Sequence, residues 1–304
     1  MNCLVTGGAG FIGSHIVDRL QADGHPTRVL DNFSTGKRGN LAASPAVDII
    51  EGDVGDFDTV SEAMEGVDTV FHEAAIASVP ETVGNPLASE HTNYRGTLNV
   101  LEAARRSGAR RVIFACSAAV YGDLPGLPKR EDMPVKPLSP YAIDKLASEY
   151  ACRMYYSLYD LETVSLRYFN VFGPRQDPSS PYSGVISIFS DCLRQGRRPV
   201  IYGDGEQTRD FVFVSDVVEA NIRAAFSETA AGKAINIANN STISINLLLE
   251  TVCRLYGQPF APDYRPVREG DIRHSRADIG AAREHLLWEP VVDFEDGLRE
   301  LLGK

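Results

Sequence analysis

The chain has 304 residues, 43% of them hydrophobic and 23% charged, which suffices for one large or two modest domains with a buried core. Its formal net charge of −11, with no extended lysine and arginine cluster, argues against a nucleic-acid polymer as partner. No apolar run is long enough to span a membrane, and the N-terminal "MNCLV" lacks signal-peptide features. The five cysteines show no CxxC spacing, so we expect neither a disulfide framework nor a metal site. A reducing, cytoplasmic location is therefore expected.

The first half of the chain alternates short β-branched runs with longer helical patterns. Strands are expected at "NCLV", "TRVLD", "VDIIEGD", "DTVFHEA" and "RRVIFACS", and a long helix at about residues 87–107. The next helix begins in "LSPYAIDK", where Ser139 suits the N-cap and Pro140 the first helical position, and "TVSLRYF" follows as the sixth strand. This alternation predicts an α/β fold, a Rossmann-like, doubly wound parallel sheet with helices on both faces.

A loop rich in proline, serine and glycine breaks this rhythm after Asn170. Its sequence is "GPRQDPSSPYSG", and the elements beyond it are mixed and less regular. We therefore expect a smaller, mixed α/β C-terminal substrate domain.

A glycine-rich stretch, "TGGAGFIG", lies between the first strand and the first helix. It places Gly7, Gly10 and Gly13 in a GxxGxxG pattern, and Asp31 ends the second strand 18 residues after Gly13. Glycines let the backbone approach a pyrophosphate, whose charge the helix N-terminus favours. The carboxylate of Asp31 can accept hydrogen bonds from an adenosine ribose and repels a 2′-phosphate, so NAD is expected rather than NADP. The alternative is a tight turn without a ligand.

Tyr141 and Lys145 are one helical turn apart and share a face of the helix that starts at Pro140. A phenol has an unperturbed pKa near 10 and is a poor base at neutral pH. We expect a neighbouring ammonium and a positive nicotinamide ring to favour the phenolate, which makes Tyr141 a candidate general base. A solvated Tyr/Lys pair on a helix surface is the alternative.

In combination these motifs resemble the extended short-chain dehydrogenase/reductase family and, within it, the UDP-sugar 4-epimerases, closest to the subgroup acting on UDP-N-acetylglucosamine. The resemblance runs over nearly the whole chain. It rests on "TGGAGFIGSH", "DNFSTG", "GDVGD", "HEAA", "SAAVYG", "SPYAIDK", "LRYFNVFGPRQDP", "GDGEQTRDFVFVSDV" and "REGDIRHS". It implies an NAD-binding domain over residues 1–169 and about 211–240, and a UDP-sugar-binding domain over about 170–210 and 241–304.

The resemblance also implies roles for individual residues. Tyr141 is the base, Lys145 positions the nicotinamide ribose, and Ser117 hydrogen-bonds the sugar O4 and Tyr141. The expected NAD contacts are Gly7, Gly10, Phe11, Ile12, Gly13, Asp31, Asn32, Ser34, Thr35, Gly36, Asp53, Val54, Ala74, Ala75, Ala77, Asn93, Tyr141, Lys145 and Tyr168. The expected substrate contacts are Ser117, Tyr141, Asn170, Val185, Tyr202, Arg209, Arg268, Asp271 and Ser275. Arg209 and Arg268 are the diphosphate candidates, because a guanidinium matches phosphate oxygens bidentately.

Ala118 and Ala119 follow Ser117 where related nucleotide-sugar dehydratases carry an acid pair and the decarboxylases keep a glutamate at the second position. Without those carboxyls the site lacks an obvious group for elimination, which leaves reversible hydride transfer. The resemblance then implies C4 epimerisation through a transient 4-keto sugar, with tightly bound NAD regenerated in each turnover.

Ser275 is expected beside the C2 substituent of the sugar, where epimerases limited to glucose and galactose tend to have tyrosine. The serine leaves room for an N-acetyl group. Two other functions stay open: a nucleotide-sugar oxidoreductase with free cofactor, and a nicotinamide-sensing protein without catalysis. The helix after Pro140 is apolar on more than one face, so with the resemblance it predicts a homodimer through a four-helix interface.

Overall fold

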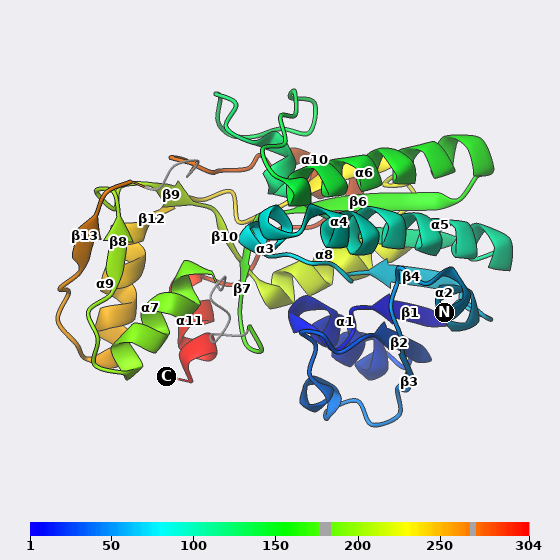
Figure 1. The fold of residues 1–304 in the computed structure, drawn as a ribbon, viewed down its shortest axis with the longest axis horizontal. Helices are drawn as coiled ribbons and strands as arrows, with labels where there is room; N and C mark the ends of the chain where they lie inside the picture. Colours follow the sequence, from blue (N-terminus) through cyan, green and yellow to red (C-terminus); the bar gives the residue numbers. More distant parts are fainter. Residues whose placement is uncertain (177–183, 268–271, 304) are drawn as a thin grey trace.

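The computed structural model, which describes residues 1–176, 184–267 and 272–303, is built around a parallel sheet (Figure 1). Its seven strands lie in the order β11-β6-β5-β4-β1-β2-β3, and every neighbouring pair is parallel. The strands are β1 (Cys3–Thr6), β2 (Thr27–Asp31), β3 (Asp48–Glu51), β4 (Thr69–His72), β5 (Arg111–Ser117), β6 (Glu162–Tyr168) and β11 (Lys233–Ile237). The strand order reverses between β1 and β4, and a crevice outside the carboxyl ends of the strands is the usual ligand site in such sheets.

Helices cover both faces of this sheet, as right-handed crossovers between parallel strands require. Contacts between elements group α1 (Phe11–Ala22) with α8 (Val214–Phe226) and α10 (Gly280–Leu286). The other layer contains α2 (Phe57–Ala63), α5 (Gly96–Ser107) and α6 (Pro140–Tyr159). Buried strands such as β5 and β6 are hydrophobic or small over most of their length, which suits a sheet covered on both sides.

A smaller lobe lies to one side of the sheet in Figure 1. Its helices are α7 (Val185–Arg194), α9 (Ile245–Tyr256) and α11 (Phe294–Leu302). Short strands pair two by two: β7 (Asn170–Phe172) with β10 (Phe211–Phe213), β9 (Thr208–Arg209) with β12 (Ile243–Ser244), and β8 (Val200–Tyr202) with β13 (Asp263–Arg265).

Each lobe has its own cluster of buried hydrophobic residues. The larger cluster fills both faces of the sheet, and the smaller one includes Phe172, Phe189 and Phe211. The chain returns to the larger cluster late in the sequence, because Ala277 and Trp288 pack there. The segment around residues 277–288 is therefore tied to the sheet rather than to the smaller lobe's core.

The remaining short helical segments lie in connections: η1 (Arg38–Leu41), α3 (Val79–Gly84), α4 (Pro86–Ser89), η2 (Glu90–Arg95) and η3 (Ala118–Tyr121). The helix expected at about residues 87–107 is thus one helical run interrupted by the π-helical η2. Ser139 caps α6 as expected, because its side chain accepts from the Ala142 amide at 3.2 Å. The predicted α/β fold with a doubly wound parallel sheet is confirmed, although strand β11 was not predicted individually.

Candidate active site

The glycine-rich turn between β1 and α1 has no room for side chains. Gly7 has a φ of 67°, and a Cβ there would lie 2.7 Å from the Ala74 nitrogen. A Cβ on Gly13 would lie 2.3 Å from the Gly7 carbonyl oxygen. Gly10 is the N-cap of α1 and, having no side chain, cannot cap the amides of the first turn. Those amides and the positive end of the helix dipole suit a pyrophosphate, so this turn fits the phosphates of a dinucleotide.

The carboxylate of Asp31 is held beside that turn in one orientation. Its Oδ2 accepts from the Ala9 amide at 2.9 Å, and its Oδ1 accepts from the Phe33 amide at 2.8 Å. A Cβ on Gly36 would lie 2.7 Å from Oδ1, so only glycine allows this approach of the loop. Each carboxylate oxygen can accept a further hydrogen bond, which fits the hydroxyls of a ribose.

The other expected cofactor residues follow the same edge of the sheet. Asp53, after β3, accepts from the Asn32 side chain at 2.8 Å. The Asn93 amide is occupied within the protein, because it accepts from the Ile76 nitrogen at 2.8 Å and donates to the Ile76 carbonyl at 3.1 Å. It fixes the loop after β4. The remaining members of the set lie in the first turn of α1 or in the segments that follow β2, β3 and β4: Phe11, Ile12, Ser34, Thr35, Val54, Ala74, Ala75 and Ala77.

Ser117, Tyr141 and Lys145 come together where β5 ends and α6 begins. The Ser117 hydroxyl accepts from the Ala119 amide at 3.1 Å and is hydrogen-bonded to the Tyr141 phenol. The Lys145 Nζ is buried and donates to the Ala115 carbonyl at 2.6 Å. Because α6 packs on β5, the two residues one turn apart on the helix face the strand that carries Ser117.

The protein environment of Tyr141 opposes ionisation of its phenol. Burial raises the pKa of Tyr141 to about 12, the hydrogen bond with Ser117 lowers it, and the charges of Cys116 and Glu73 raise it further. The Lys145 Nζ lies 5.9 Å from the Tyr141 ring centroid, and burial lowers the Lys145 pKa. The ammonium alone therefore does not produce the expected phenolate. Desolvation outweighs it, and a further positive charge is needed beside the phenol.

Glu73 is an ionisable residue of this site that was not predicted. It follows β4 directly, and its Oε1 accepts from the Tyr168 hydroxyl at 2.8 Å. Burial raises the pKa of Glu73 to about 7, although the Tyr168 hydrogen bond and the charge of Lys145 lower it. The signal was present in "HEAA", an acidic residue directly after a buried strand, at the edge where parallel strands end.

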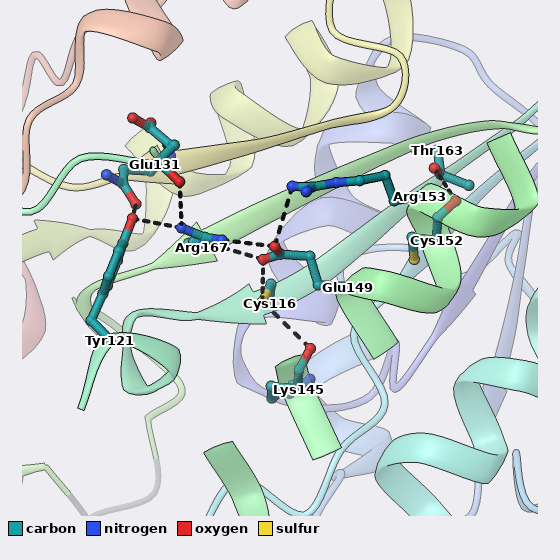
Figure 2. Close-up of polar contacts among 10 residues, drawn as sticks. Cys116, Tyr121, Glu131, Lys145, Glu149, Cys152, Arg153, Thr163 and Arg167 are labelled. Carbon is teal, nitrogen blue, oxygen red and sulfur yellow. Dashed lines mark hydrogen bonds and ion pairs between the residues drawn. The ribbon is translucent and has the colours of Figure 1, made fainter. Parts of the chain in front are cut away.

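A buried polar network behind these residues joins α6 to β6 (Figure 2). Arg167 donates to both carboxylate oxygens of Glu149, at 2.8 and 2.7 Å, and the two side chains are 3% and 2% exposed. Arg167 also donates to the Tyr121 hydroxyl at 2.8 Å, and the Cys116 thiol donates to Glu149 at 3.3 Å. Cys116 and Tyr121 lie on either side of Ser117 in the chain, so the network fixes the segment that carries Ser117.

A cavity of about 220 Å³ lies between β7, β10 and the start of α7. Three expected substrate residues line it, namely Asn170, Val185 and Arg209, together with Gln176 and Phe211. A hollow of about 350 Å³ lies at the opposite, amino-terminal edge of the sheet, where it contains no predicted residue among its described lining. The smaller cavity is therefore the candidate substrate site, because it combines an arginine and an amide with apolar walls.

The remaining expected substrate residues lie around β8 and β9 or outside the described structure. The Ser275 amide donates to the Thr208 carbonyl at 3.1 Å, which places Ser275 beside Arg209. Tyr202 ends β8, next to β13, and is not among the residues that line the cavity in the described part of the chain. The predictions for Arg268 and Asp271 lie outside the described residues.

The described ranges contain no group of three or more histidine, cysteine, aspartate or glutamate residues that could hold a metal ion. No helix in those ranges combines the length and apolar character needed to cross a membrane.

Comparison with known proteins assigns the chain to a family. Residues 3–238 match the model of the NAD dependent epimerase/dehydratase family. The UDP-glucose 4-epimerase of Mycolicibacterium smegmatis is 42% identical over 303 residues, covering 98% of this chain and 96% of that protein. The UDP-N-acetyl-alpha-D-glucosaminuronate decarboxylase of Bacillus cytotoxicus is 37% identical over 99% of this chain and 96% of its own length.

Among solved structures, the UDP-N-acetylglucosamine 4-epimerase from Methanobrevibacter ruminantium in complex with UDP-N-acetylmuramic acid superimposes with a TM-score of 0.95. It is 41% identical and covers 99% of this chain and 97% of its own. The family match spans well over half of the chain and agrees with the predicted resemblance and cofactor. The chain belongs to the NAD dependent epimerase/dehydratase family.

Proposed function

We propose that the protein is an NAD-dependent enzyme that reversibly inverts C4 of UDP-hexoses. The observation that carries this is the meeting of Ser117, Tyr141 and Lys145 at the end of β5, with Ala118 and Ala119 after the serine. The epimerase names of the Mycolicibacterium and Methanobrevibacter proteins support the same reaction.

The reaction assigns a separate task to each of the three residues. Tyr141 takes the proton of the 4-hydroxyl, directly or through Ser117, and returns it to the O4 oxygen after the 4-keto sugar has turned its other face to the returning hydride. Ser117 is held by the Ala119 amide, so its hydroxyl is aimed rather than free to rotate away. Lys145 holds a positive charge behind the site. When bound, NAD supplies the hydride acceptor and the positive ring that favours the Tyr141 phenolate.

The fit of the cofactor rests on the turn and on Asp31. At the crowded positions Gly7 and Gly13 no side chain fits, so the backbone amides of the turn are open to the phosphates. The fixed Asp31 carboxylate suits a free 2′-hydroxyl and repels a 2′-phosphate. These features support NAD over NADP.

The sugar nucleotide is proposed to lie over the cavity of β7, β10 and α7. Arg209 is the described candidate for the diphosphate, since a guanidinium carries a fixed positive charge and several donors. Asn170 offers an amide at the same wall. The roles of Arg268, Asp271 and Tyr202 stay predictions, as does the division into a cofactor domain and a substrate domain.

Acceptance of N-acetylated sugars is a further part of the proposal. The half-buried Ser275 lies beside Arg209 through its bond to Thr208, and serine leaves more space than tyrosine at that position. Ser275→Tyr is expected to abolish conversion of UDP-N-acetylglucosamine while UDP-glucose is still converted, because the larger ring overlaps the acetamido group. Unchanged N-acetyl conversion contradicts the role of Ser275, and loss of both conversions indicates general disruption.

The experiment that tests the reaction uses the purified protein with UDP-glucose and UDP-N-acetylglucosamine in separate incubations. The expected result is the C4 epimer of one or both, with no net accumulation of NADH, because the cofactor returns to its starting state. Lasting NADH contradicts epimerisation and favours a dehydrogenase. Release of carbon dioxide from a UDP-hexuronate, the reaction named for the Bacillus cytotoxicus relative, favours a decarboxylase.

We also infer that two copies of the chain associate through α6, in a cytoplasmic homodimer. The support is a row of exposed apolar side chains on one face of that helix: Tyr150, Met154 and Leu158. Residues spaced by four lie above one another on a helix, so they form a continuous stripe. The resemblance implies that the same stripe on a second copy of the chain covers these side chains.

A further inference from the structure

Glu73 is an ionisable group in the site that the proposed reaction leaves without a task. The parallel pairing of β4 with β5, continued by one residue, places Glu73 opposite Ala115, whose carbonyl receives the Lys145 ammonium. Its carboxylate accepts from Tyr168 on β6, on the other side of β5. Since Tyr168 pairs with Ser117, this hydrogen bond crosses β5 at the level of the catalytic serine.

The position of the carboxylate is fixed by neighbours on three sides. The Glu73 amide donates to the Thr6 carbonyl at 3.1 Å, and a Cβ on Gly7 would touch the Glu73 backbone at 3.0 Å. The Tyr168 hydroxyl, which holds the carboxylate, receives a hydrogen bond from the Asn221 amide at 2.7 Å. The charge of Glu73 therefore stays at one place in the site.

The elements around Glu73 carry other titratable side chains. These groups are Tyr168 from β6, Tyr141 and Lys145 from α6, Cys116 from β5 and His72 from β4. Helix α8 contributes the neutral Asn221. Burial lowers the pKa of His72 to about 3 and raises the pKa values of Cys116 and Tyr168 well above their usual range. Burial raises the pKa of Glu73 to about 7, so its charge changes near neutral pH, and burial also lowers the pKa of Lys145.

The charge of Glu73 acts on Tyr141 in a known direction. An ionised carboxylate raises the pKa of the Tyr141 phenol, because two negative charges repel each other. The interaction is reciprocal, because a Tyr141 phenolate in turn disfavours the charge of Glu73. A site that forms a phenolate is therefore more stable with Glu73 protonated, and the two groups titrate as a coupled pair.

We propose that Glu73 is a positioning residue that acts through Tyr141, its charge setting how readily Tyr141 gives up a proton. The inference rests on the proposed function, because the ionisation of Tyr141 matters only if Tyr141 is the base. In this arrangement a negative charge on either group opposes a negative charge on the other. Tyr168 and Asn221 hold the carboxyl in place.

The first test compares the holoenzyme with Glu73→Gln, which keeps the shape and removes the charge. The pH dependence of kcat is measured with whichever of UDP-glucose and UDP-N-acetylglucosamine the wild type converts. The acid limb is expected to move to lower pH by about one unit, because the phenolate forms more easily without a neighbouring carboxylate. Glu65→Gln is the matched control, since Glu65 is exposed and lies before β4 at the far edge of the sheet.

A second measurement follows Tyr141 without turnover. The ultraviolet absorbance of phenolate, taken as the difference between each holoenzyme and its Tyr141→Phe counterpart, gives the ionisation curve of that one tyrosine. The curve of Glu73→Gln is expected at lower pH than the wild-type curve. No conversion of either sugar by the wild type contradicts the proposed function. Conversion with an unmoved acid limb and an unmoved phenolate curve contradicts only the role of Glu73.

Thermal stability tests the titration of Glu73 itself. Its folded-state pKa of about 7 lies above the ordinary 4.5, so its contribution is fully present below pH 4.5 and is lost as pH rises to about 7. The Tm of the wild type is expected to fall relative to that of Glu73→Gln over this window. Tyr168→Phe retains the carboxyl, removes a hydrogen bond that lowers its pKa, and should extend the decline to higher pH. If Glu73→Gln does not fold, this variant carries the test, and a Tm profile identical to the wild type contradicts the proposal.

Discussion

The two faces of α6 differ in a way that burial of hydrophobic groups alone does not produce. The inner face, toward the sheet and the segment of α4 and η2, carries polar residues that are 7% exposed or less: Asp144, Lys145, Ser148 and Glu149. The face away from the sheet carries apolar residues that are 42% exposed or more: Tyr150, Met154 and Leu158. The inner face is polar although it is buried, and the outer face is apolar although it is exposed.

The difference shows that the inner face is completed within the chain, whereas the outer face needs a covering surface. Every polar group of the inner face has a partner: Ser89 for Asp144, Ala115 for Lys145, Asn93 for Ser148 and Arg167 for Glu149. Paired groups avoid most of the cost of leaving water, so the helix can keep a charged lysine next to the reacting tyrosine. The outer face buries its apolar area only if another surface covers it, which is why we assign it to a second copy of the chain.

The largest effect is expected from the inner face, at the reacting group itself. Tyr141→Phe removes one hydroxyl and leaves the packing of the ring unchanged. Epimerisation is expected to fall by roughly 10²–10⁴-fold, the usual contribution of a general acid–base group, while the protein remains folded and keeps its cofactor. Steady-state turnover and the amount of co-purified NAD check this. A variant that turns over nearly as fast as the wild type removes Tyr141 from the base role.

The next effect concerns the support of the inner face. Glu149→Gln leaves the Arg167 guanidinium buried without its counter-charge, so the free energy of unfolding should fall by about 3–5 kcal/mol. Denaturant unfolding measures the loss. The double variant Glu149→Leu with Arg167→Met is the control, since removing both charges should recover much of the stability. If the single variant is as stable as the wild type, the pair does not hold α6 against β6.

A substitution on the outer face should weaken dimerisation rather than the stability of the fold. Met154→Asp places a charge in the stripe, and the free energy of dimerisation should weaken by at least about 2 kcal/mol, roughly 30-fold in Kd. Light scattering across micromolar concentrations follows the mass. Thr229→Asp adds the same charge at an exposed polar position outside α6 and serves as the matched control. A wild type that is monomeric throughout contradicts the dimer.

The smallest effect on stability is expected at Ser139, the N-cap residue of α6. Ser139→Ala removes the side chain that accepts from the Ala142 amide, so stability should fall by about 1 kcal/mol with little change in turnover. Ser139→Asp keeps an acceptor and should preserve stability. A large loss of activity in Ser139→Ala would mean that the cap positions Tyr141 and not only the helix end.

Local patterns in the sequence were enough for much of the fold and of the cofactor site. The alternation of strands and helices predicted the doubly wound sheet, because each pattern reports a single element. The close approach of Gly13 to the Gly7 carbonyl and the capping bond of Ser139 involve neighbours in the chain, so spacing alone indicates them.

Two features of the site depend on contacts that spacing does not reveal. Lys145 was expected to lower the pKa of the Tyr141 phenol. That pKa is raised by desolvation, which only the packed structure determines. Glu73 was not predicted, because site carboxyls were expected only at the positions directly following Ser117. Its partner Tyr168 is 95 residues away in the chain, and no local pattern joins them.

The sequence by itself determined the class of fold and the glycine-rich turn, which follow from short-range periodicity and turn chemistry. The family resemblance predicted Ser117, Tyr141 and Lys145 as a catalytic set. Only the tertiary structure decided that Arg167 pairs with Glu149, that Ser275 lies beside Arg209 and that Glu73 stands near Tyr141 with a pKa of about 7. The physical reason is that contact between distant segments and the burial of charge are properties of the packed chain as a whole, so a sequence window does not contain them.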